Sequence, residues 1–233
     1  MHLFHCPDLL ADLIELPEEE AHHATSVLRL ASGARIGVLD GKGTRAVATI
    51  ELVSKRGCTA RIIERSTTPP ERTARIHLAV APTKQMDRYE WFVEKAVELG
   101  VDRITPLVTD RTERAKLRID RLQRVAISAM KQSQRSWLPQ IDELTTLKQL
   151  LAHDLPDHRF FGWCEGEHRS LMDAYDPNSH ALVLIGPEGD FTAEEAGLLR
   201  SSGSTAVAIG DARLRTETAA LAACTWMSLA QQR

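Results

Sequence analysis

The feature that most constrains this chain is a strand-to-helix junction that occurs twice near its C-terminal end. Residues 182–195 read LVLIGPEGDFTAEE, an aliphatic run that stops at Gly186. Residues 205–223 read TAVAIGDARLRTETAALAA, and here the apolar run stops at Gly210. Short apolar runs bounded by glycine are typical of buried strands. Two such strands, each followed by a glycine turn and a helix, indicate a pocket that binds its ligand through backbone groups.

Strands and helices alternate through the C-terminal two thirds of the chain. Apolar runs at 75–82 and 181–185 predict buried strands, and apolar residues at helical spacing over 86–100 and 119–134 predict amphipathic helices. This alternation is typical of an α/β domain with a mostly parallel sheet that helices cover on both faces. Ligands of such sheets lie beyond the carboxyl ends of the strands. Both glycine turns fall at that edge.

The N-terminal part of the chain has a different pattern. Residues 34–64 alternate apolar and polar positions and are interrupted at Asp40-Gly41 and at Arg56-Gly57, which predicts short strands joined by hairpin turns. Several such strands favour a small β-barrel, and a helix is expected before Gly33. A polar segment with two adjacent prolines follows. We therefore expect two domains, residues 1–69 and residues 70–233.

Composition excludes several classes of protein. The chain has 233 residues, of which 43% are hydrophobic and 26% charged, as in an ordinary soluble domain. It contains no apolar run near the roughly 20 residues that a membrane span needs, and its first residues do not resemble a signal peptide. The four cysteines lie far apart without a CxxC pair. We therefore expect no metal site and no disulfide framework, and a cytoplasmic location.

The net charge of −3 hides an uneven distribution. Basic residues outnumber acidic ones over residues 1–150, and the reverse holds over 151–233. Basic side chains are concentrated in residues 29–65 and 103–135. A protein that is acidic overall could bind a polyanion such as RNA at these segments. Solvated basic surfaces are the alternative explanation for either segment alone.

Neither glycine turn is a nucleotide-binding motif. The stretch GPEGDF lacks the GxGxxG spacing, and no Gly-Lys-Ser/Thr sequence follows either turn. Thr192 and Glu195 have the spacing of a capping box, which predicts a helix from about residue 193. Thr216 is the predicted N-cap of the last helix, with Glu217 in its first turn. Because Glu188 and Glu217 lie near the turns, a neutral or cationic ligand fits better than a polyphosphate. A plain strand-to-helix turn is the alternative for the first stretch.

Taken together, IGPEG and LRTETA closely resemble the SPOUT class of RNA methyltransferases. More narrowly, they resemble the family that methylates N3 of a uridine in 16S ribosomal RNA. The stretches KQMDRYEWFVEKAVELGVDRITPLVTDRT and MKQSQRSWLP are similar to that family's central motifs, and HHATSVLRLASGARIGVLDGKG is similar to its N-terminal domain. Two positions depart from the pattern. Many members have Glu where Lys131 stands, and many have Pro where this chain has Asp211 or Ala212.

The resemblance implies a fold and an activity. It implies a C-terminal SPOUT domain with a mostly parallel sheet and a deep trefoil knot, preceded by a small PUA-like RNA-binding barrel. True knots are rare among protein folds. It also implies an enzyme that uses S-adenosylmethionine to methylate uridine N3 in the 16S ribosomal RNA of the small subunit. A homodimer formed through the C-terminal helix is implied as well, with no membrane and no metal involved.

Candidate residues follow from the glycine turns and the basic segments, together with the resemblance. Those expected to contact the cofactor, mainly through their backbone, are Leu184, Ile185, Gly186, Pro187, Glu188, Gly189, Ile209, Gly210, Leu214, Arg215 and Thr216. Those expected to contact RNA are Arg29, Arg45, Arg121, Arg124, Lys131, Gln132 and Arg135. Arg215 is the catalytic candidate, either polarising a uracil carbonyl or clamping a phosphate. Glu217 is a second catalytic candidate, as a base, or else it only stabilises the first turn of its helix.

Two other functions stay open at this point. A non-catalytic RNA-binding or ribosome-assembly module would share the basic segments but would not need two glycine turns. A SPOUT methyltransferase that acts on tRNA or on a ribose 2′-hydroxyl would share the turns. The similarity of the N-terminal segment to the PUA-like domain favours the 16S ribosomal RNA enzyme over this second alternative.

Overall fold

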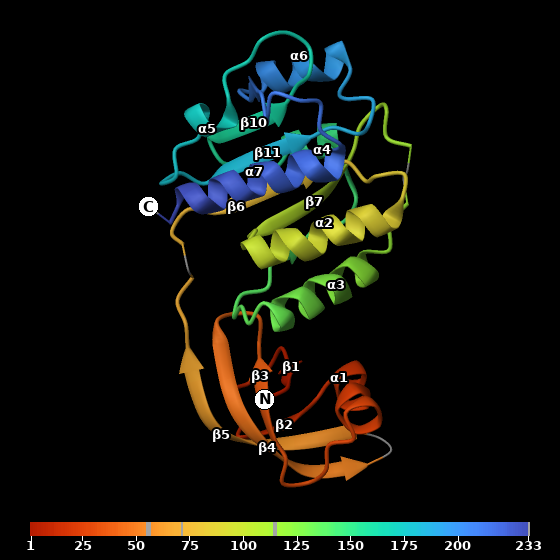
Figure 1. Ribbon diagram of the computed structural model, residues 1–233, viewed down its shortest axis with the longest axis vertical. Coiled ribbons are helices and arrows are strands. Elements are labelled where there is room, and N and C mark those ends of the chain that lie inside the picture. Colours follow the sequence, from red (N-terminus) through yellow and green to blue (C-terminus); the bar gives the residue numbers. More distant parts are fainter. Residues whose placement is uncertain (55–56, 71, 114–115, 233) are drawn as a thin grey trace. The chain divides into compact units, whose positions relative to one another are not determined.

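Figure 1 shows the computed structural model of the chain. It describes residues 1–54, 57–70, 72–113 and 116–232. The chain forms two compact units: unit 1 comprises residues 1–71 and 127–138, and unit 2 comprises residues 72–126 and 139–233. The expected division into domains at residues 69 and 70 stays a prediction.

Unit 1 is built on a five-stranded sheet in which the strand order is β1-β3-β4-β5-β2. Its strands are β1 (Leu3–His5), β2 (Leu13–Glu15), β3 (Arg35–Leu39), β4 (Thr44–Ser54) and β5 (Gly57–Thr67). β1 runs parallel to β3, and the other neighbours are antiparallel. The helix α1 (Glu18–His22) continues directly into a π-helical turn, η1 (His23–Val27). A helix before Gly33 was predicted from the sequence, and this prediction is confirmed.

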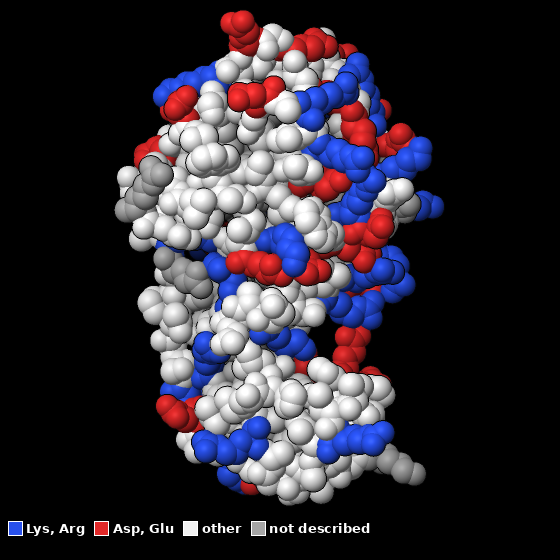
Figure 2. Space-filling model, in the orientation of Figure 1, with Lys and Arg blue, Asp and Glu red and all other residues white. Residues whose placement is uncertain are grey.

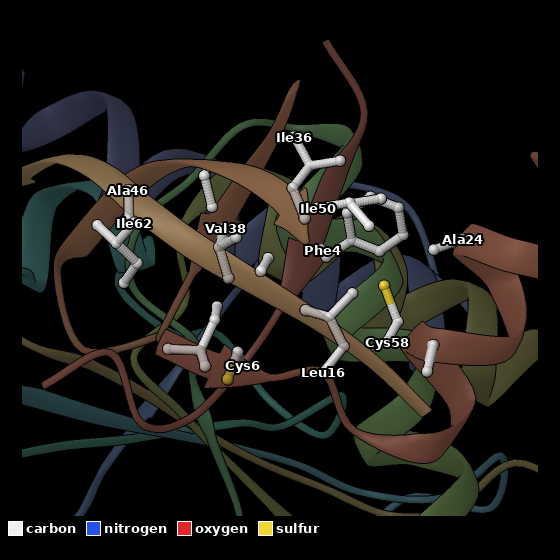
Figure 3. Close-up of a cluster of buried hydrophobic side chains, with 14 of the residues drawn as sticks. Phe4, Cys6, Leu16, Ala24, Ile36, Val38, Ala46, Ile50, Cys58 and Ile62 are labelled. Atoms are coloured by element: carbon white, nitrogen blue, oxygen red, sulfur yellow. The ribbon is translucent and has the colours of Figure 1, made fainter. Parts of the chain in front are cut away.

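The core of unit 1 lies on one face of this sheet. Figure 3 shows Phe4, Ile36 and Ile50 within it, and all three side chains are fully buried. Among the described residues β1 and β2 form no ladder with each other, so the expected barrel is an open sheet. The two edges nevertheless approach, because the Cys6 thiol, just after β1, lies 3.7 Å from the carbonyl oxygen of Glu15 in β2. The sheet is therefore curled around its core without closing.

The predicted hairpin turn at Asp40-Gly41 is confirmed. The Asp40 carboxylate accepts hydrogen bonds from the amides of Lys42 at 2.7 Å and Thr44 at 2.8 Å. Gly41 has a φ of 72°, a left-handed conformation that glycine adopts without strain. The second predicted turn joins β4 to β5, but its Arg56 lies outside the described residues.

A segment distant in sequence completes unit 1. It consists of the end of the helix α3 (Ile119–Gln132) and the residues that follow it. Here the carbonyl of Ser136 accepts from the amide of Gly43 at 2.9 Å, and the Trp137 indole donates to the carbonyl of Thr68 at 3.1 Å. A Cβ atom at Gly43 would lie 2.6 Å from both the Thr68 carbonyl and the Trp137 ring. Only glycine therefore permits this contact.

Unit 2 contains a sheet whose strand order is β12-β10-β11-β6-β7-β8, with β9 also pairing with β7. Its strands are β6 (Ile76–Val80), β7 (Arg103–Val108), β8 (Gln140–Ile141), β9 (Thr145–Thr146), β10 (His158–Gly162), β11 (Ala181–Ile185) and β12 (Thr205–Val207). Every one of these pairings is parallel. The parallel α/β sheet predicted from the sequence is thus confirmed.

Helices cover both faces of this sheet. Besides α3 they are α2 (Met86–Leu99), α4 (Leu147–Leu151), α5 (Leu171–Ala174), α6 (Ala193–Ser201) and α7 (Thr216–Ala230). α2 and α7 pack against each other, and α7 also packs on β6 and β11 (Figure 1). On the other face α4 and α6 bury leucines against Phe161, Leu182 and Leu184. All five residues of β6 and of β11 are buried, as expected of strands covered on both sides.

Local signals placed most helix ends correctly. α2 stops at Gly100, which has a φ of 84°, and α6 begins at Ala193 behind a complete capping box formed by Thr192 and Glu195.

The predicted N-cap of the last helix is wrong. Arg215 is the N-cap of α7, and Thr216 is its first residue. Thr216 lies one residue inside the helix, where its hydroxyl donates to the carbonyl of Gly186, 3.0 Å away, and no side chain of the described residues caps α7.

A buried polar network lies within the sheet of unit 2. His77 Nε2 is 2.7 Å from the hydroxyl oxygen of Thr105, and that hydroxyl donates to the carboxylate of Asp142. His77 must therefore donate from Nε2, which fixes its tautomer. Arg103 donates to the same carboxylate at 2.7 Å. Burial and the charge of Arg103 lower the pKa of His77 to about 4.

We expect this network to make stability depend on pH. Because the pKa of His77 lies below its unfolded value, the stabilisation is complete above about pH 6.5 and is lost as the pH falls through 4. The loss corresponds to roughly 3 kcal/mol. His77→Gln keeps a donor for Thr105 but does not titrate. In urea denaturation from pH 7.5 to 4, the free energy of unfolding should decline less for this variant than for the wild type. If it declined equally in both proteins, the lowered pKa of His77 would be contradicted.

Candidate active site

The two glycine turns lie next to each other at the carboxyl edge of the sheet. The first follows β11, and its residues 187–190 form a tight turn in which the amide of Asp190 donates to the carbonyl of Pro187 at 2.9 Å. The second follows β12 and leads into α7. The hydroxyl of Thr216, at the start of α7, donates to the carbonyl of Gly186. This buried hydrogen bond joins the two turns directly.

Both turns have backbone groups available for a ligand. Among the described residues the amides of Gly189 and Gly210 donate to no other protein group. Gly189 and Gly210 are exposed, whereas Gly186 and Pro187 are buried. Leu184 is fully buried within the sheet, where it pairs with Phe161 and Ala79 of the neighbouring strands. These observations fit the prediction that this edge binds its ligand through the main chain.

A side chain would meet different surroundings at each of the three glycines. A Cβ atom at Gly186 would lie 3.1 Å from the amide nitrogen of Phe191, so the turn itself leaves no room for a side chain. At Gly189 the nearest atom would be Cδ of Arg111, at 3.2 Å. At Gly210 the nearest would be a Leu214 methyl carbon at 3.7 Å, which is an ordinary contact. At Gly186 the protein's own backbone therefore occupies the space that a side chain would need.

The loop that follows β7 forms hydrogen bonds to the first glycine turn. These contacts were not predicted from the sequence. Arg111 donates to the carbonyls of Gly189 at 2.5 Å and Phe191 at 3.1 Å. The carboxylate of Glu195 accepts from the amide of Asp110 at 2.8 Å. Arg111 had been noticed only as one of many basic residues between 103 and 135. No sequence signal links it to a turn 78 residues away.

The two catalytic candidates differ in their surroundings. Arg215 is exposed at the start of α7. Glu217 is only 7% exposed, and its carboxylate lies 3.6 Å from the guanidinium of Arg88 on α2. The N-terminal end of α7 further stabilises a negative charge at this position. The environment of Glu217 therefore fits a structural role at the start of the helix.

The acidic side chains near the turns have partners within the protein. Glu188 accepts from the amide of Lys84 at 3.4 Å. The ammonium group of Lys84 in turn lies 3.0 Å from the carboxylate of Glu113. Among the described residues no group of three His, Cys, Asp or Glu side chains is placed to hold a metal ion.

The residues expected to contact RNA divide between the two units. Arg29, Arg45, Lys131, Gln132 and Arg135 belong to unit 1, whereas Arg121 and Arg124 belong to unit 2. Arg29 is exposed and has a φ of 54°, which is unusual for a residue other than glycine. Arg45 is half-buried and Gln132 is exposed.

Several of these basic side chains are paired within the protein. Arg121 forms an ion pair with Glu90 at 2.6 Å, and Arg124 forms one with Asp120 at 2.7 Å. Lys131 contacts Glu20 at 2.5 Å, and their side chains are only 18% and 11% exposed. Lys131 therefore holds the end of α3 to the start of unit 1, and an RNA phosphate would have to compete with Glu20 for it.

Comparison with known proteins supports one assignment for the whole chain. Residues 70–228 match the RNA methyltransferase domain, and residues 16–63 match the RNA methyltransferase PUA domain. The ribosomal RNA small subunit methyltransferase E of Rickettsia conorii is 30% identical over 90% of this chain and 87% of its own length. The protein of that name from Bacillus subtilis is 27% identical over 94% and 90%. This chain belongs to the ribosomal RNA small subunit methyltransferase E family.

Solved structures of similar proteins agree with that family. A probable rRNA-methyltransferase from Porphyromonas gingivalis is 36% identical, with a TM-score of 0.90 over 100% of this chain and 99% of its own. A ribosomal RNA small subunit methyltransferase E from Neisseria gonorrhoeae, bound to S-adenosyl methionine, is 30% identical, with a TM-score of 0.88 over 98% and 97%. Unit 2 therefore has the SPOUT fold, and unit 1 has the PUA-like sheet. The threading of residues 205–223 into a trefoil knot stays a prediction.

The glycine geometry yields a test of stability. Gly186→Ala should lower the free energy of unfolding by about 1–3 kcal/mol, because its Cβ would be forced against the backbone of Phe191. Gly210→Ala should change it by no more than about 0.5 kcal/mol, because space is available. Chemical denaturation of both variants and the wild type measures the difference. Equal effects at the two positions would show that the crowding at Gly186 is relieved by movement of the turn.

Proposed function

We propose that this protein transfers the methyl group of S-adenosylmethionine to N3 of a uridine in 16S ribosomal RNA of the small ribosomal subunit. The observation that carries the proposal is the pair of glycine turns, joined by Thr216 and Gly186, with amides at Gly189 and Gly210 that no described residue of the protein accepts from. The full-length similarity to the family, including a relative bound to S-adenosyl methionine, supports it. We place the enzyme in the cytoplasm, where ribosomal RNA is assembled into subunits.

The cofactor would lie along the backbone of Leu184 to Gly189, of Ile209 and Gly210, and of Leu214 to Thr216. When bound, it supplies a sulfonium methyl group that a nucleophile can attack. The amides of Gly189 and Gly210 would donate hydrogen bonds to its polar groups, and the bond between Thr216 and Gly186 would hold the two turns at a fixed separation. These contacts use main-chain atoms, which explains why the acidic side chains nearby can be paired with other residues.

The reaction would require N3 of a uridine to lose its proton to water, while N3 bonds to the methyl carbon and the bond between that carbon and sulfur breaks, which would release S-adenosylhomocysteine. Negative charge then develops on the flanking carbonyl oxygens of the ring. We propose that Arg215, which is exposed at the start of α7, stabilises that charge. Orientation of the base against the cofactor would supply much of the remaining rate. We assign Glu217 to holding the first turn of α7 through Arg88 rather than to proton removal.

For the RNA we propose that unit 1 is the anchor. Arg29 and Arg45 lie in its basic segment, and phosphate contacts from such residues contribute affinity that depends on salt but not on base sequence. Gln132 and Arg135, at the end of α3, also belong to this unit. Because Arg121, Arg124 and Lys131 have acidic partners, we expect each of them to contribute less than Arg29.

The non-catalytic RNA-binding module remains the main alternative. The decisive experiment is mass spectrometry of nucleosides from 16S ribosomal RNA of cells with and without the gene. The proposal requires 3-methyluridine to disappear on deletion and to return with the wild-type gene. Unchanged 3-methyluridine, together with loss of a ribose-methylated nucleoside or of a tRNA modification, would favour the other SPOUT activity. No change in any nucleoside would favour the binding module.

The roles of Arg215 and Arg29 can be separated by kinetics. Arg215→Ala should slow single-turnover methyl transfer on small subunits about 100-fold, because charge stabilisation is lost, with RNA affinity nearly unchanged. Arg29→Ala should weaken RNA binding and lower its salt dependence by about one phosphate contact, with the methyl transfer step unchanged. Lys148→Ala, an exposed basic residue on α4, is the control. Equal effects of the Arg215 and Arg29 changes on RNA affinity would contradict this division of labour.

We also propose a homodimer formed through α7. Trp226 and Leu229 on α7 are 40% and 49% exposed, and Met172 on the neighbouring α5 is 51% exposed. Figure 2 shows that mainly uncharged side chains surround α7 on this face of unit 2. Trp226, Leu229 and Met172 also line a small cavity of about 120 Å³. Apolar surface of this kind is typical of a protein interface.

Sedimentation equilibrium tests the dimer. The wild type should sediment as a dimer at micromolar concentration, and Trp226→Glu should weaken association more than tenfold, because a charge would be buried in the interface. Leu198→Glu places the same charge at an exposed apolar residue of α6 and serves as the control. A monomeric wild type, or equal effects of the two changes, would refute an α7 interface.

A further inference from the structure

Arg111 holds the first glycine turn from the loop that follows β7. One nitrogen of its guanidinium, Nη1, donates to the carbonyls of both Gly189 and Phe191, at 2.5 Å and 3.1 Å. Hydrogen bonds from a charged donor are stronger than those between neutral groups. Two carbonyl groups of the segment after β11 are thus bound by a single side chain from another strand end.

The stem of Arg111 explains why residue 189 is glycine. A Cβ atom at Gly189 would lie 3.2 Å from Cδ of Arg111 and 3.7 Å from its Cβ. The first of these distances is tighter than an ordinary contact. A side chain at 189 would therefore push the guanidinium away from the carbonyls that it binds. Glycine at position 189 therefore leaves room for the side chain of Arg111.

The loop that carries Arg111 is itself fixed. Glu195, which is 7% exposed, accepts from the amide of Asp110 with one carboxylate oxygen and from the amide of Thr192 with the other, each at 2.8 Å. The amide of Thr109 donates to the hydroxyl of Thr112 at 2.9 Å. Arg111 thus projects from a loop that is anchored to the start of α6.

The turn is also held from its other side. Asp190 has a φ of 62°, a conformation that is unfavourable for a residue with a side chain. Its carboxylate accepts from the amide of Cys164, after β10, at 2.9 Å and from the amide of Phe191 at 2.7 Å. A turn held from two sides does not have to be ordered when a ligand binds, which favours affinity.

We infer that Arg111 is a positioning residue for the cofactor: by binding the carbonyls of Gly189 and Phe191, it holds the turn in the conformation that binds S-adenosylmethionine. The inference rests on the proposed function, because it concerns the same turn. Arg111 acts through the main chain and contributes no group to the reaction. Its loss weakens cofactor binding and leaves the methyl transfer step intact once the cofactor is bound.

A direct contact with RNA is the competing explanation, because Arg111 is exposed and lies in the basic segment 103–135. That role would leave cofactor affinity unchanged in the absence of RNA. If Arg111 contacted RNA, removal of its charge would also make RNA affinity depend less steeply on salt concentration, by the contribution of about one phosphate contact. The two roles are therefore separable in a single set of variants.

The experiment uses the full-length protein and S-adenosylmethionine alone, by calorimetry. Arg111→Met keeps a stem against Gly189 but removes the charged donor, and we expect the Kd to rise about tenfold. Arg111→Lys retains one charged nitrogen and should bind with intermediate affinity. Arg118→Met is the control, since Arg118 is exposed and pairs with Asp120. In steady-state assays the KM for the cofactor should rise about tenfold in Arg111→Met, with kcat within about twofold of the wild type.

A double-mutant cycle tests the link to Gly189. Gly189→Ala should weaken cofactor binding in the wild-type background, because its Cβ displaces Arg111. In an Arg111→Ala background the same change should have little effect, because the crowding atom is gone. If the methyl group at 189 instead blocked the cofactor directly, its effect would be the same in both backgrounds.

Two results would overturn the inference. One is an unchanged Kd for S-adenosylmethionine in Arg111→Met, whether or not its RNA binding becomes less sensitive to salt. The other is an additive double-mutant cycle. If Arg111→Met melts at a lower temperature than the wild type, the inference is tested with Arg111→Lys and the double-mutant cycle instead. These measurements are made at a temperature at which every variant is folded. A wild-type protein that binds no S-adenosylmethionine would instead refute the proposed function itself.

Discussion

The candidate site depends on one buried hydrogen bond, from the hydroxyl of Thr216 to the carbonyl of Gly186. It joins the end of β11 to the start of α7 across 30 residues of sequence. Such a bond contributes about 1 kcal/mol net, but leaving the carbonyl buried without a partner would cost more. α7 also packs on α2, β6 and β11, so this bond and that packing together hold the start of the helix beside the end of β11. The two glycine turns are therefore parts of one site.

Sequence reasoning succeeded where the physical signal is local. The bounds of β11, Ala181–Ile185, follow from an unbroken apolar run that both faces of the sheet bury. The end of α2 follows from Gly100, and the start of α6 from the capping box of Thr192. The N-cap of α7 was assigned by the same local rule and is wrong. Thr216 had a second partner available, Gly186, which only the folded chain brings within reach.

The electrostatics of the chain could not be predicted in the same way. Composition located the basic segments, but the pairing of individual charges depends on tertiary structure. Lys131 pairs with Glu20, 111 residues away, and Arg121 pairs with Glu90 on a different helix. The lysine at position 131 is thus engaged in an internal ion pair. An excess of basic residues therefore indicates a possible RNA surface without identifying which side chains can reach a phosphate.

The acidic residues near the glycine turns likewise have partners within the protein. Glu188 and Glu217 suggested a preference for a cationic ligand, because both lie beside the glycine turns in sequence. In the folded protein Glu217 faces Arg88, and Glu188 accepts from the amide of Lys84. Glu195 is used to fix the loop that carries Arg111. Since these carboxylates serve the protein's own structure, the groups that this edge of the sheet offers to a ligand are mainly main-chain amides and carbonyls. The partners of these carboxylates come from distant parts of the chain, and no residue spacing in the sequence predicts them.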